Sequence, residues 1–428
     1  MITADSATPS PLPAAARGRI FLYLGVLIML VEFGNPTGWL IQLPISFFLK
    51  NKLHLSAHQL ADFLLVSAIP LYGSFLFGFV RDVWNPFGMR DRGFLVLFGA
   101  ICAAVYTVFA FIPPSRVTML IAVLMLTCAF RFAYAAQNGM TSALAQQNMM
   151  SGQISAIWNV FSFVPVLAAN LAGGVLSDAL EGQNAAFAAR IIFLAGAALM
   201  AATAVYGLWK PRAVFDHLHA EGGPRAHPWQ DMKRLFRHKP VYPALLIWSL
   251  WQFSPGSATP LQYYLQNTLH ASDAQWGQWN AIYLGSFIPM FLLYGLLCRR
   301  YALGRLLFWG AVVAVPQMVP LLLVHNVTGA LIAAAPIGLM GGLCSAAYTD
   351  LLIRSCPKGL QGSVLMMSWG LYWVSTRFGD VLGTRLYDHY GNFTVCVIAI
   401  TVVYALIVPL LRLVPKGLVA TADGGMAG

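Results

Sequence analysis

The sequence predicts an all-α membrane protein whose twelve transmembrane helices form two pseudo-symmetric bundles of six. Three observations lead to this prediction: the composition, the number of apolar stretches and an internal repeat. Of the 428 residues, 58% are hydrophobic and only 10% are charged, and the mean hydropathy is +0.68. Soluble domains carry about 25% charged residues, so this composition is typical of a chain that crosses a bilayer many times.

Twelve apolar stretches are long enough to cross a membrane, because a spanning helix needs about 20 mainly apolar residues. Six of them lie in each half of the chain, and we number them as spans one to twelve. In order, they cover residues 20–43, 59–80, 94–112, 117–138, 154–176, 186–209, 241–266, 276–298, 306–324, 327–352, 362–386 and 395–414.

The repeat consists of two pairs of similar segments at nearly the same displacement. The segment PISFFLKNKLHLS begins at Pro44, and PLQYYLQNTLHAS begins 216 positions later at Pro260. Similarly, WNVFSFVPVLAANLAGGVLSD begins at Trp158, and WGLYWVSTRFGDVLGTRLYD begins 211 positions later at Trp369. These two matches indicate a duplication. Tandem halves of this size in an apolar chain are typical of transporters whose repeats enclose a site near the bilayer midplane.

The charge distribution predicts the topology. The net charge is +11, but the basic residues lie between the spans and not in a soluble domain, so we expect no nucleic-acid partner. With the N-terminus inside, the only Lys and Arg residues on the outer side are Lys50, Lys52, Arg116, Arg190 and Arg385. The positive-inside rule therefore predicts a multi-pass protein of the cell membrane, the inner membrane in a Gram-negative bacterium, with both termini in the cytoplasm.

The spans and the longest polar interruption define the predicted domains. Residues 1–19 form a disordered cytoplasmic tail, 20–209 the first bundle, 210–240 a cytoplasmic linker, 241–414 the second bundle and 415–428 a second cytoplasmic tail. The linker histidines lack the spacing of metal ligands, and the six cysteines are scattered along the spans. These patterns predict neither a metal site nor a disulfide framework, and we expect no cofactor.

The loop between spans two and three carries a family motif. Residues 78–95 read GFVRDVWNPFGMRDRGFL. This segment resembles the cytoplasmic loop signature of the major facilitator superfamily, in which a glycine allows two helices to approach closely while an aspartate and two basic residues form an inter-helix charge network. The resemblance assigns these roles to Gly78, Asp82, Arg90 and Arg92. Such a network would lock the two bundles in the outward-open state and release on switching, whereas the alternative is a solvated basic loop.

The extended loop, with Pro-Phe-Gly between the aspartate and the basic pair, is similar to that of the folate-biopterin transporter family. Residues 47–56, 254–269 and 356–367 agree with this family in order and position. The resemblance covers nearly the whole chain and implies transport of a folate-like or pterin-like solute; muropeptide permeases and photosynthetic-complex assembly proteins are relatives. Members usually carry acidic residues in span four, whereas Arg131 is the only charge in residues 127–139 here. This departure weighs against folate itself as the substrate.

Charges are costly at bilayer depth, so ionisable residues inside the spans are candidates for function. In span one, Glu32 shares a helical face with Asn35 and Trp39. In span four, Arg131 shares a face with Tyr134 and Asn138. We expect both faces to line a central cavity, where Glu32 takes up the coupling proton and the planar Arg131 guanidinium binds a carboxylate or phosphate. A Glu32–Arg131 ion pair is expected, either as part of this mechanism or as a permanent structural pair.

In the second half, Trp373, Arg377 and Asp380 share one face of span eleven. Arg377 can reach Asp380 one turn away, so the two are either substrate contacts or a structural pair. We expect Asp350, near the end of span ten, to pair with Arg354 and not to contact substrate.

Further polar and aromatic side chains complete the predicted substrate site. Together they can stack on a flat ring and hydrogen-bond to its edge, although aromatic residues of a membrane protein also form interfacial belts. They are Asn159, Gln252, Gln262, Tyr263 and Asn280.

No enzyme signature competes with a transport function. The sequence has no G-x-x-x-x-G-K-[ST] loop, no H-E-x-x-H and no G-x-S-x-G in a strand-turn-helix context. We therefore expect a secondary active transporter of a small organic solute, anionic or zwitterionic and folate-like or pterin-like, that works by alternating access with a proton or counter-ion. Two alternatives stay open: a symporter of muropeptides or other glycoconjugates, and a non-transporting membrane assembly factor.

Overall fold

The computed structural model describes residues 12–38, 45, 49, 53, 63, 65–181, 184–218 and 228–424, and within these ranges the chain is helical without a β-strand. The first half contains α1 (Ala14–Phe33), α4 (Ile69–Tyr72), α5 (Ser74–Val83), α6 (Asp91–Phe111), α7 (Arg116–Gln147), α8 (Ser151–Glu181) and α9 (Ala185–Leu208). After it come α10 (Arg212–Phe215), α11 (Pro228–Arg237), α12 (Val241–Gln252), α13 (Thr259–Tyr263), α14 (Asp273–Leu297), α15 (Leu303–Ala314), α16 (Val327–Ser355), α17 (Gln361–Tyr390), α18 (Phe393–Leu410) and α19 (Lys416–Val419).

The helices match the predicted spans. Nine helices of the described part are long and apolar enough to cross a membrane, and a tenth span results if the segments on either side of the 41° bend at Gly73 are counted as one. The other two predicted spans correspond to α17, which carries charged residues, and to the segment that runs from α12 through α13 into a π-helical turn at Tyr264–Thr268. The prediction of an all-α membrane fold is therefore confirmed.

Span seven is broken for a local reason. After α12 the chain reaches Pro255, which lacks a backbone donor, and Gly256, whose φ is +108°. Only glycine adopts this conformation readily. Gly383 of α17 approaches the Gly256 backbone so closely that a Cβ on Gly383 would collide with it. The helix can resume only at Thr259, where α13 begins.

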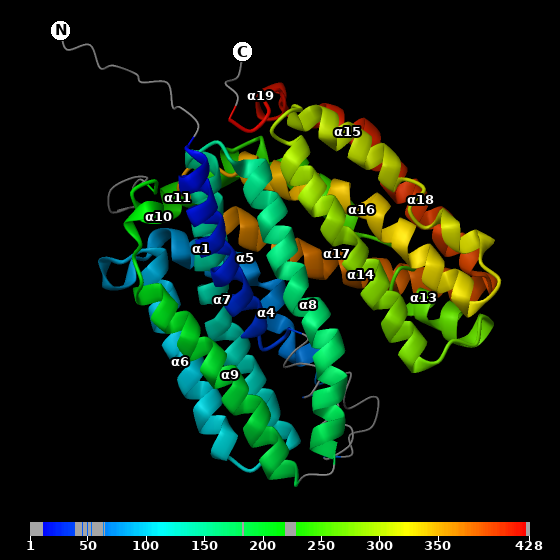
Figure 1. Cartoon of the computed structure of the whole chain (residues 1–428), viewed down its shortest axis with the longest axis horizontal. Helices are drawn as coiled ribbons and strands as arrows, with labels where there is room; N and C mark the ends of the chain where they lie inside the picture. The colour runs from blue at the N-terminus through cyan, green and yellow to red at the C-terminus, as the bar shows by residue number, and fades with distance from the viewer. Residues whose placement is uncertain are drawn as a thin grey trace.

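The helices form two bundles, α1 with α4–α9 and α12–α18, and the start of α1 and the short helix α19 lie at one face of the molecule (Figure 1). We call this the terminal face; α10, α11 and α19 lie on it. The bundles contact each other through α5 with α17 and α8 with α14, and these helices occupy corresponding places in the two halves. Away from the terminal face, α8 and α14 diverge (Figure 1).

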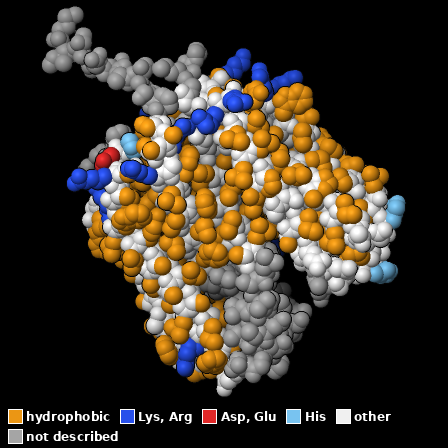
Figure 2. Space-filling model, viewed as in Figure 1, with side chains coloured by type: hydrophobic (Ala, Val, Ile, Leu, Met, Phe, Trp, Pro, Cys, Tyr) orange, Lys and Arg blue, Asp and Glu red, His pale blue; other side chains and the backbone are white. Residues whose placement is uncertain are grey.

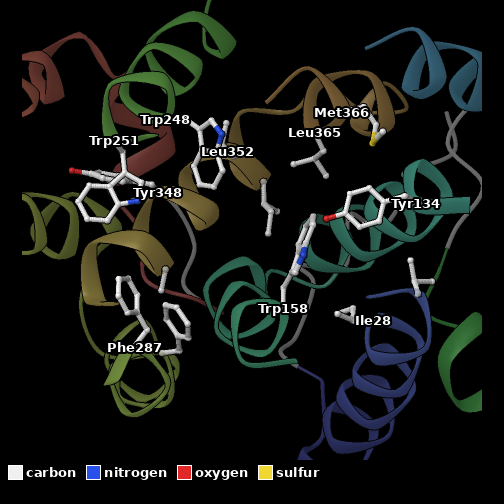
Figure 3. Close-up of a cluster of buried hydrophobic side chains, with 14 of the residues drawn as sticks. Ile28, Tyr134, Trp158, Trp248, Trp251, Phe287, Tyr348, Leu352, Leu365 and Met366 are labelled. Atoms are coloured by element: carbon white, nitrogen blue, oxygen red, sulfur yellow. The ribbon is translucent and has the colours of Figure 1, made fainter. Parts of the chain in front are cut away.

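Buried apolar side chains from both bundles form the contact between them (Figure 3). Buried residues of α7 and α16 include small ones such as Ala135 and Ala346, which are common where membrane helices pack closely. Larger side chains fill the remaining space: Ile28, Tyr134 and Trp158 from the first bundle, and Leu352, Leu365 and Met366 from the second.

Candidate functional site

The centre of the candidate site is Arg131, which has no hydrogen-bond or ion-pair partner among the described residues. Arg131 on α7 is only 2% exposed, its Nε has no hydrogen-bond partner, and it forms no ion pair or hydrogen bond within the described part of the chain. Its Cζ lies 5.3 Å from the centre of the Tyr134 ring, one turn along the same helix. This cation–π contact attracts the guanidinium but satisfies none of its five donors.

Tyr134 separates Arg131 from the nearest carboxyl group. The Tyr134 hydroxyl donates a hydrogen bond of 3.2 Å to Oε1 of Glu32, which is half-buried on α1. The expected Glu32–Arg131 ion pair is absent from this structure, and the phenol of Tyr134 is the group that bonds to the carboxyl. The charges of Glu32 and Arg131 therefore compensate each other without direct contact, with Tyr134 between them.

Asn35 lies close enough to the Glu32 carboxyl to interact with it, and it also shapes the chain after α1. The Asn35 side chain accepts hydrogen bonds from the backbone nitrogen and the hydroxyl of Thr37, at 3.1 and 2.9 Å, and so fixes the turn that follows α1. Asparagine commonly forms such a turn with the residue two positions later. Trp39 lies outside the described residues.

Asn138 and Asn159 lie where the two bundles meet. Asn138 donates to Sδ of Met366 on α17 at 3.6 Å, and its own side-chain oxygen has no partner. Asn159 donates to the Thr349 hydroxyl of α16 at 3.2 Å and to the Ser155 carbonyl. Both amides therefore connect the halves on the terminal-face side.

The predicted Arg377–Asp380 pair is also absent. Asp380 accepts bonds from the backbone nitrogen and the hydroxyl of Thr259, at 2.9 and 2.8 Å, and thereby caps the start of α13. Arg377 is exposed and forms no ion pair in the described part of the chain. Trp373 points its indole nitrogen into a buried place without a partner and makes an edge contact with Tyr372.

The remaining candidates of spans seven and eight differ in exposure. Gln252 and Gln262 are half-buried, whereas Tyr263 is exposed. Asn280 donates to the Trp276 carbonyl, 3.0 Å away within its own helix. Among the described residues, none of these four side chains forms a hydrogen bond with Arg131 or Glu32.

The loop motif places one carboxylate between the bundles. Asp82, at the end of α5, accepts bonds from the backbone nitrogens of Gly362 and Ser363, at 3.2 and 2.7 Å, and from the Ser363 hydroxyl at 2.6 Å. It thus satisfies donors of the first turn of α17, which have no partner within the helix. Gly78 allows this approach, because a Cβ there would collide with the Gly362 carbonyl. We call this contact the first lock.

The cation beside Asp82 is Arg81, which the motif did not suggest. Arg81 pairs with Asp82 at 2.7 Å and also with Asp91 at the start of α6. The two predicted cations lie elsewhere. Arg92 donates to the Gly207 and Leu208 carbonyls at the end of α9. Arg90 precedes the first residue of α6, with a backbone φ of +53°. The neighbour of Asp82 in sequence, and not the later Arg pair, provides the described charge partner.

A family model of the Major Facilitator Superfamily matches residues 28–384, most of the chain. The chain belongs to this superfamily. It is therefore a multi-pass membrane transporter of a family whose members are not enzymes. No curated protein sequence matches it.

Several solved structures of the superfamily share the fold. A bacterial homologue of the iron transporter ferroportin in an outward-facing state has a TM-score of 0.69 at 14% identity, covering 92% of this chain and 98% of that one. The human organic anion transporter MFSD10 has a TM-score of 0.62 at 14% identity, with 94% and 100% covered. The E. coli fucose:proton symporter has a TM-score of 0.66 at 15% identity, with 92% and 98% covered.

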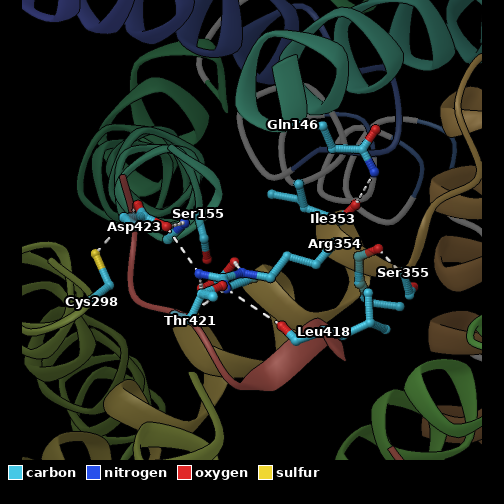
Figure 4. Close-up of polar contacts among 12 residues, drawn as sticks. Gln146, Ser155, Cys298, Ile353, Arg354, Ser355, Leu418, Thr421 and Asp423 are labelled. Atoms are coloured by element: carbon cyan, nitrogen blue, oxygen red, sulfur yellow. Dashed lines mark hydrogen bonds and ion pairs between the residues drawn. The ribbon is translucent and has the colours of Figure 1, made fainter. Parts of the chain in front are cut away.

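A second polar network of this superfamily member lies on the terminal face (Figure 4). As expected, Asp350 pairs with Arg354, at 2.8 Å, and the Tyr294 hydroxyl donates to the same carboxylate at 2.7 Å. Arg354 also pairs with Asp423 of the C-terminal tail at 3.0 Å. Sequence reasoning missed Asp423, since the tail has no motif and its partners lie between 69 positions (Arg354) and 271 positions (Gly152) away.

Gln146 closes the terminal face between the two networks. Its side-chain nitrogen donates to the carbonyls of Ile353 and Cys356, at 2.7 and 2.8 Å, and its oxygen accepts from Gln361 at 3.0 Å. Carbonyls at a helix end lack partners within the helix, so Gln146 stabilises the end of α16 from the opposite bundle. A polar residue beyond the predicted end of span four was the only sequence signal.

Proposed function

We propose that this chain is a secondary active transporter of small organic anions, in which Arg131 binds the anion and Glu32 binds the coupling proton. One observation carries the proposal: a guanidinium buried at bilayer depth has no hydrogen bond or ion pair in the described part of the chain, and a carboxyl group lies next to it beyond Tyr134.

The cost of burying Arg131 favours an anionic ligand. An ion taken out of water without a partner costs several kcal/mol, and a carboxylate or phosphate would recover much of this through charge-assisted, bidentate hydrogen bonds of about 1.5–3 kcal/mol each. A neutral sugar would recover less, and a cation would add repulsion. The free donors of Arg131 therefore select for an anion or the anionic part of a zwitterion.

The position of Glu32 supports proton coupling. While Glu32 is ionised, its charge and that of Arg131 sum to zero; once Glu32 is protonated, the positive charge of Arg131 is uncompensated. An incoming anion then binds more tightly. By linkage, the anion favours protonation to the same degree, so the two bind together, as a symporter requires.

The terminal face supports the direction of access. Lys and Arg side chains gather there on the visible face, above an apolar belt (Figure 2). This charge bias supports both termini being cytoplasmic and the protein lying in the cell membrane. The two bundles, proposed as residues 20–209 and 241–414, would rock about the site, and the closed terminal face then corresponds to an outward-facing state. Residues 1–19 and 415–428 would be its tails and 210–240 its linker.

The loop motifs support a finer assignment to folate-like or pterin-like substrates, and this is part of the proposal. A thermal-shift screen tests it. Purified protein is heated with pterins, folates, simple carboxylates, organic phosphates, muropeptides and amino sugars. We expect carboxylates or phosphates to raise the melting temperature of wild type, since a ligand at 100 times its Kd stabilises by about 2.7 kcal/mol.

The matched variants are Arg131→Met and Arg377→Met. The anion-dependent shift should disappear in Arg131→Met and persist in Arg377→Met, because Arg377 is exposed. A shift by neutral sugars alone would favour the glycoconjugate alternative, whereas an anion-dependent shift that survives Arg131→Met would contradict the proposed site. Copurification with pigment-binding polypeptides, without any ligand shift, would favour an assembly factor.

A further inference from the structure

The first lock has a counterpart in the other half of the molecule, but its carboxylate comes from elsewhere. The repeat displacement of 216 positions places Cys298, at the end of α14, where Asp82 stands at the end of α5. The helix that each would cap also corresponds: α17 begins at Gln361 and α8 at Ser151. The duplicated position therefore lacks the acid that its partner helix needs.

Asp423 of the C-terminal tail supplies this acid. Its carboxylate accepts hydrogen bonds from the backbone nitrogens of Gly152 and Gln153, at 3.0 and 2.8 Å, in the first turn of α8. In the first lock, the Asp82 carboxylate likewise accepts hydrogen bonds from the backbone nitrogens of Gly362 and Ser363, in the first turn of α17. The close approach is repeated too, because a Cβ on Gly152 would lie 2.6 Å from Cβ of Cys298.

The charge partner is equivalent as well. Asp82 pairs with Arg81 at 2.7 Å, and Asp423 pairs with Arg354 at 3.0 Å. Figure 4 shows Asp423 between Cys298 and Arg354, and the Cys298 thiol lies 3.7 Å from the Asp423 carboxylate. The Asp423 side chain is 1% exposed, so the tail is inserted into the contact and does not merely lie on its surface.

The backbone of the tail holds both bundles. In the second bundle, Asp423 donates to the Cys298 carbonyl at 2.9 Å, and the Thr421 carbonyl accepts from Arg354 at 2.9 Å. In the first bundle, the Met149 carbonyl accepts from Gly424 at 2.9 Å. These bonds cannot all persist if α8 and α14 separate at the terminal face.

We propose that residues 414–424 form a detachable strap which closes the terminal face by inserting Asp423 as the acid of a second lock. The strap makes the contact between the bundles symmetric although the duplicated loop lacks its acid. It has to leave α8 before the terminal face can open, and anything that binds or modifies the tail can therefore bias the transporter between its two states.

Pulsed electron spin resonance distances across the terminal face test the strap without a substrate. Spin labels are placed at Arg212→Cys, exposed on α10 directly after the first bundle, and at Arg300→Cys, exposed between α14 and α15 of the second bundle. The background carries Cys128→Ser, because Cys128 is the one exposed cysteine among the described residues. Asp423→Lys, a chain that ends after Pro415, and the control Lys416→Ala, an exposed residue of α19, are compared in nanodiscs.

We expect Asp423→Lys and the shortened chain to increase the population with the longer distance about ten-fold, because the closed face then loses the hydrogen bonds and the ion pair of a buried charged group. Lys416→Ala should match wild type. Asp82→Lys, which breaks the first lock, shows that the labels report opening. Unchanged distances in both tail variants, with a label pair whose distance Asp82→Lys lengthens, would overturn the strap.

The inference rests on the proposed alternation between two states but not on the proposed substrate. If no anion stabilises the protein while the tail variants still lengthen the distance, the anion site is wrong and the strap stands. If anions bind at Arg131 but the tail variants do not change the distance, the anion site stands and the strap is wrong. The shortened chain covers the case in which Lys at position 423 disturbs the local fold.

Discussion

Arg131 is a single residue whose proposed role in binding lowers the stability of the ligand-free protein. It is buried without a hydrogen bond or ion pair to any described residue, and this burial is a cost in the ligand-free protein. We therefore expect Arg131→Met, which keeps the length of the side chain and removes the charge, to raise the ligand-free stability by about 1–3 kcal/mol. The melting temperature of the purified protein measures this effect.

The exposed Arg377→Met provides the control, with a change near zero. A lower melting temperature for Arg131→Met would show that Arg131 holds the fold together. The permanent structural role, which the sequence left open, would then be the better explanation.

Glu32 allows a second residue-level prediction. Glu32→Gln keeps an oxygen that can accept the Tyr134 hydrogen bond but removes the titrating group. Exchange of a bound anion across proteoliposomes should continue at a rate within about three-fold of wild type, whereas accumulation driven by a pH gradient should be lost. Coupling requires a proton that binds and leaves with the substrate.

Tyr134→Phe is the matched control for Glu32→Gln, because it removes the hydroxyl and leaves the carboxyl able to titrate. It should retain accumulation. If Glu32→Gln still accumulates substrate against its gradient, the proton binds at another group.

The sequence could indicate Glu32 and Arg131 but not their partners. A charge within an apolar span is visible in the sequence, since burial there is costly. Which atom it contacts depends on rotamers and on neighbouring helices. For this reason the predicted Glu32–Arg131 and Arg377–Asp380 pairs did not form: Tyr134 and Thr259 took the carboxylates instead.

Among the helices, the break in span seven depends on Gly256 itself and on Gly383 of α17, which packs against it. Gly256 has a φ of +108°, and a Cβ there would collide with Cys396 of α18. Gly256→Ala should therefore lower the stability by about 1–3 kcal/mol, through backbone strain and overpacking. Thermal unfolding in detergent, followed by tryptophan fluorescence, measures the shift.

Gly285→Ala is the control for this prediction. Gly285 lies within α14, and a Cβ there meets no atom within 4 Å. Alanine favours a helix over glycine by up to about 1 kcal/mol, so this variant should be neutral or slightly more stable. Equal effects of both substitutions would show that the break does not need glycine.

Apolar length predicted the helices well but not their ends. Helix α7 continues to Gln147, nine residues past the expected end of span four at position 138. The extension is polar, so hydropathy excluded it, yet it is buried against the other bundle and carries Gln146. Contact between bundles stabilises these turns, and a criterion based on lipid exposure alone cannot detect them.

At the scale of the whole molecule, the duplication carried more information than any motif. It predicted two similar bundles, and the two principal contacts between them correspond to each other: α5 packs on α17, and its counterpart α14 packs on α8, the counterpart of α17. It could not predict that the second lock takes its acid from Asp423, which is 271 positions from Gly152. A single polar residue in a short tail has no local signal for such a distant partner.

The strap leads to a prediction of pH dependence for the whole molecule. Burial, followed by the charge of Asp350, raises the pKa of Asp423 to about 6, although Arg354 and the backbone nitrogens of Gln153 and Gly152 act in the opposite direction. In a detached strap the carboxyl is in water, with an ordinary pKa of about 3.9. At a pH between about 3.9 and about 6, Asp423 is therefore protonated in the docked strap and ionised in the detached strap.

Docking should consequently be tightest below about pH 4, weaken as the pH rises toward 6, and change little above that. Spin-label distances between positions 212 and 300, recorded from about pH 4 to about pH 8, should show the open population increasing up to about pH 6 and then levelling off. Asp423→Asn has no carboxyl at this position, so its open population should lack the Asp423-dependent change over the same range. If the wild-type face closed further as the pH rose, the Arg354 ion pair would outweigh burial, and the ionised carboxylate would be the form that docks.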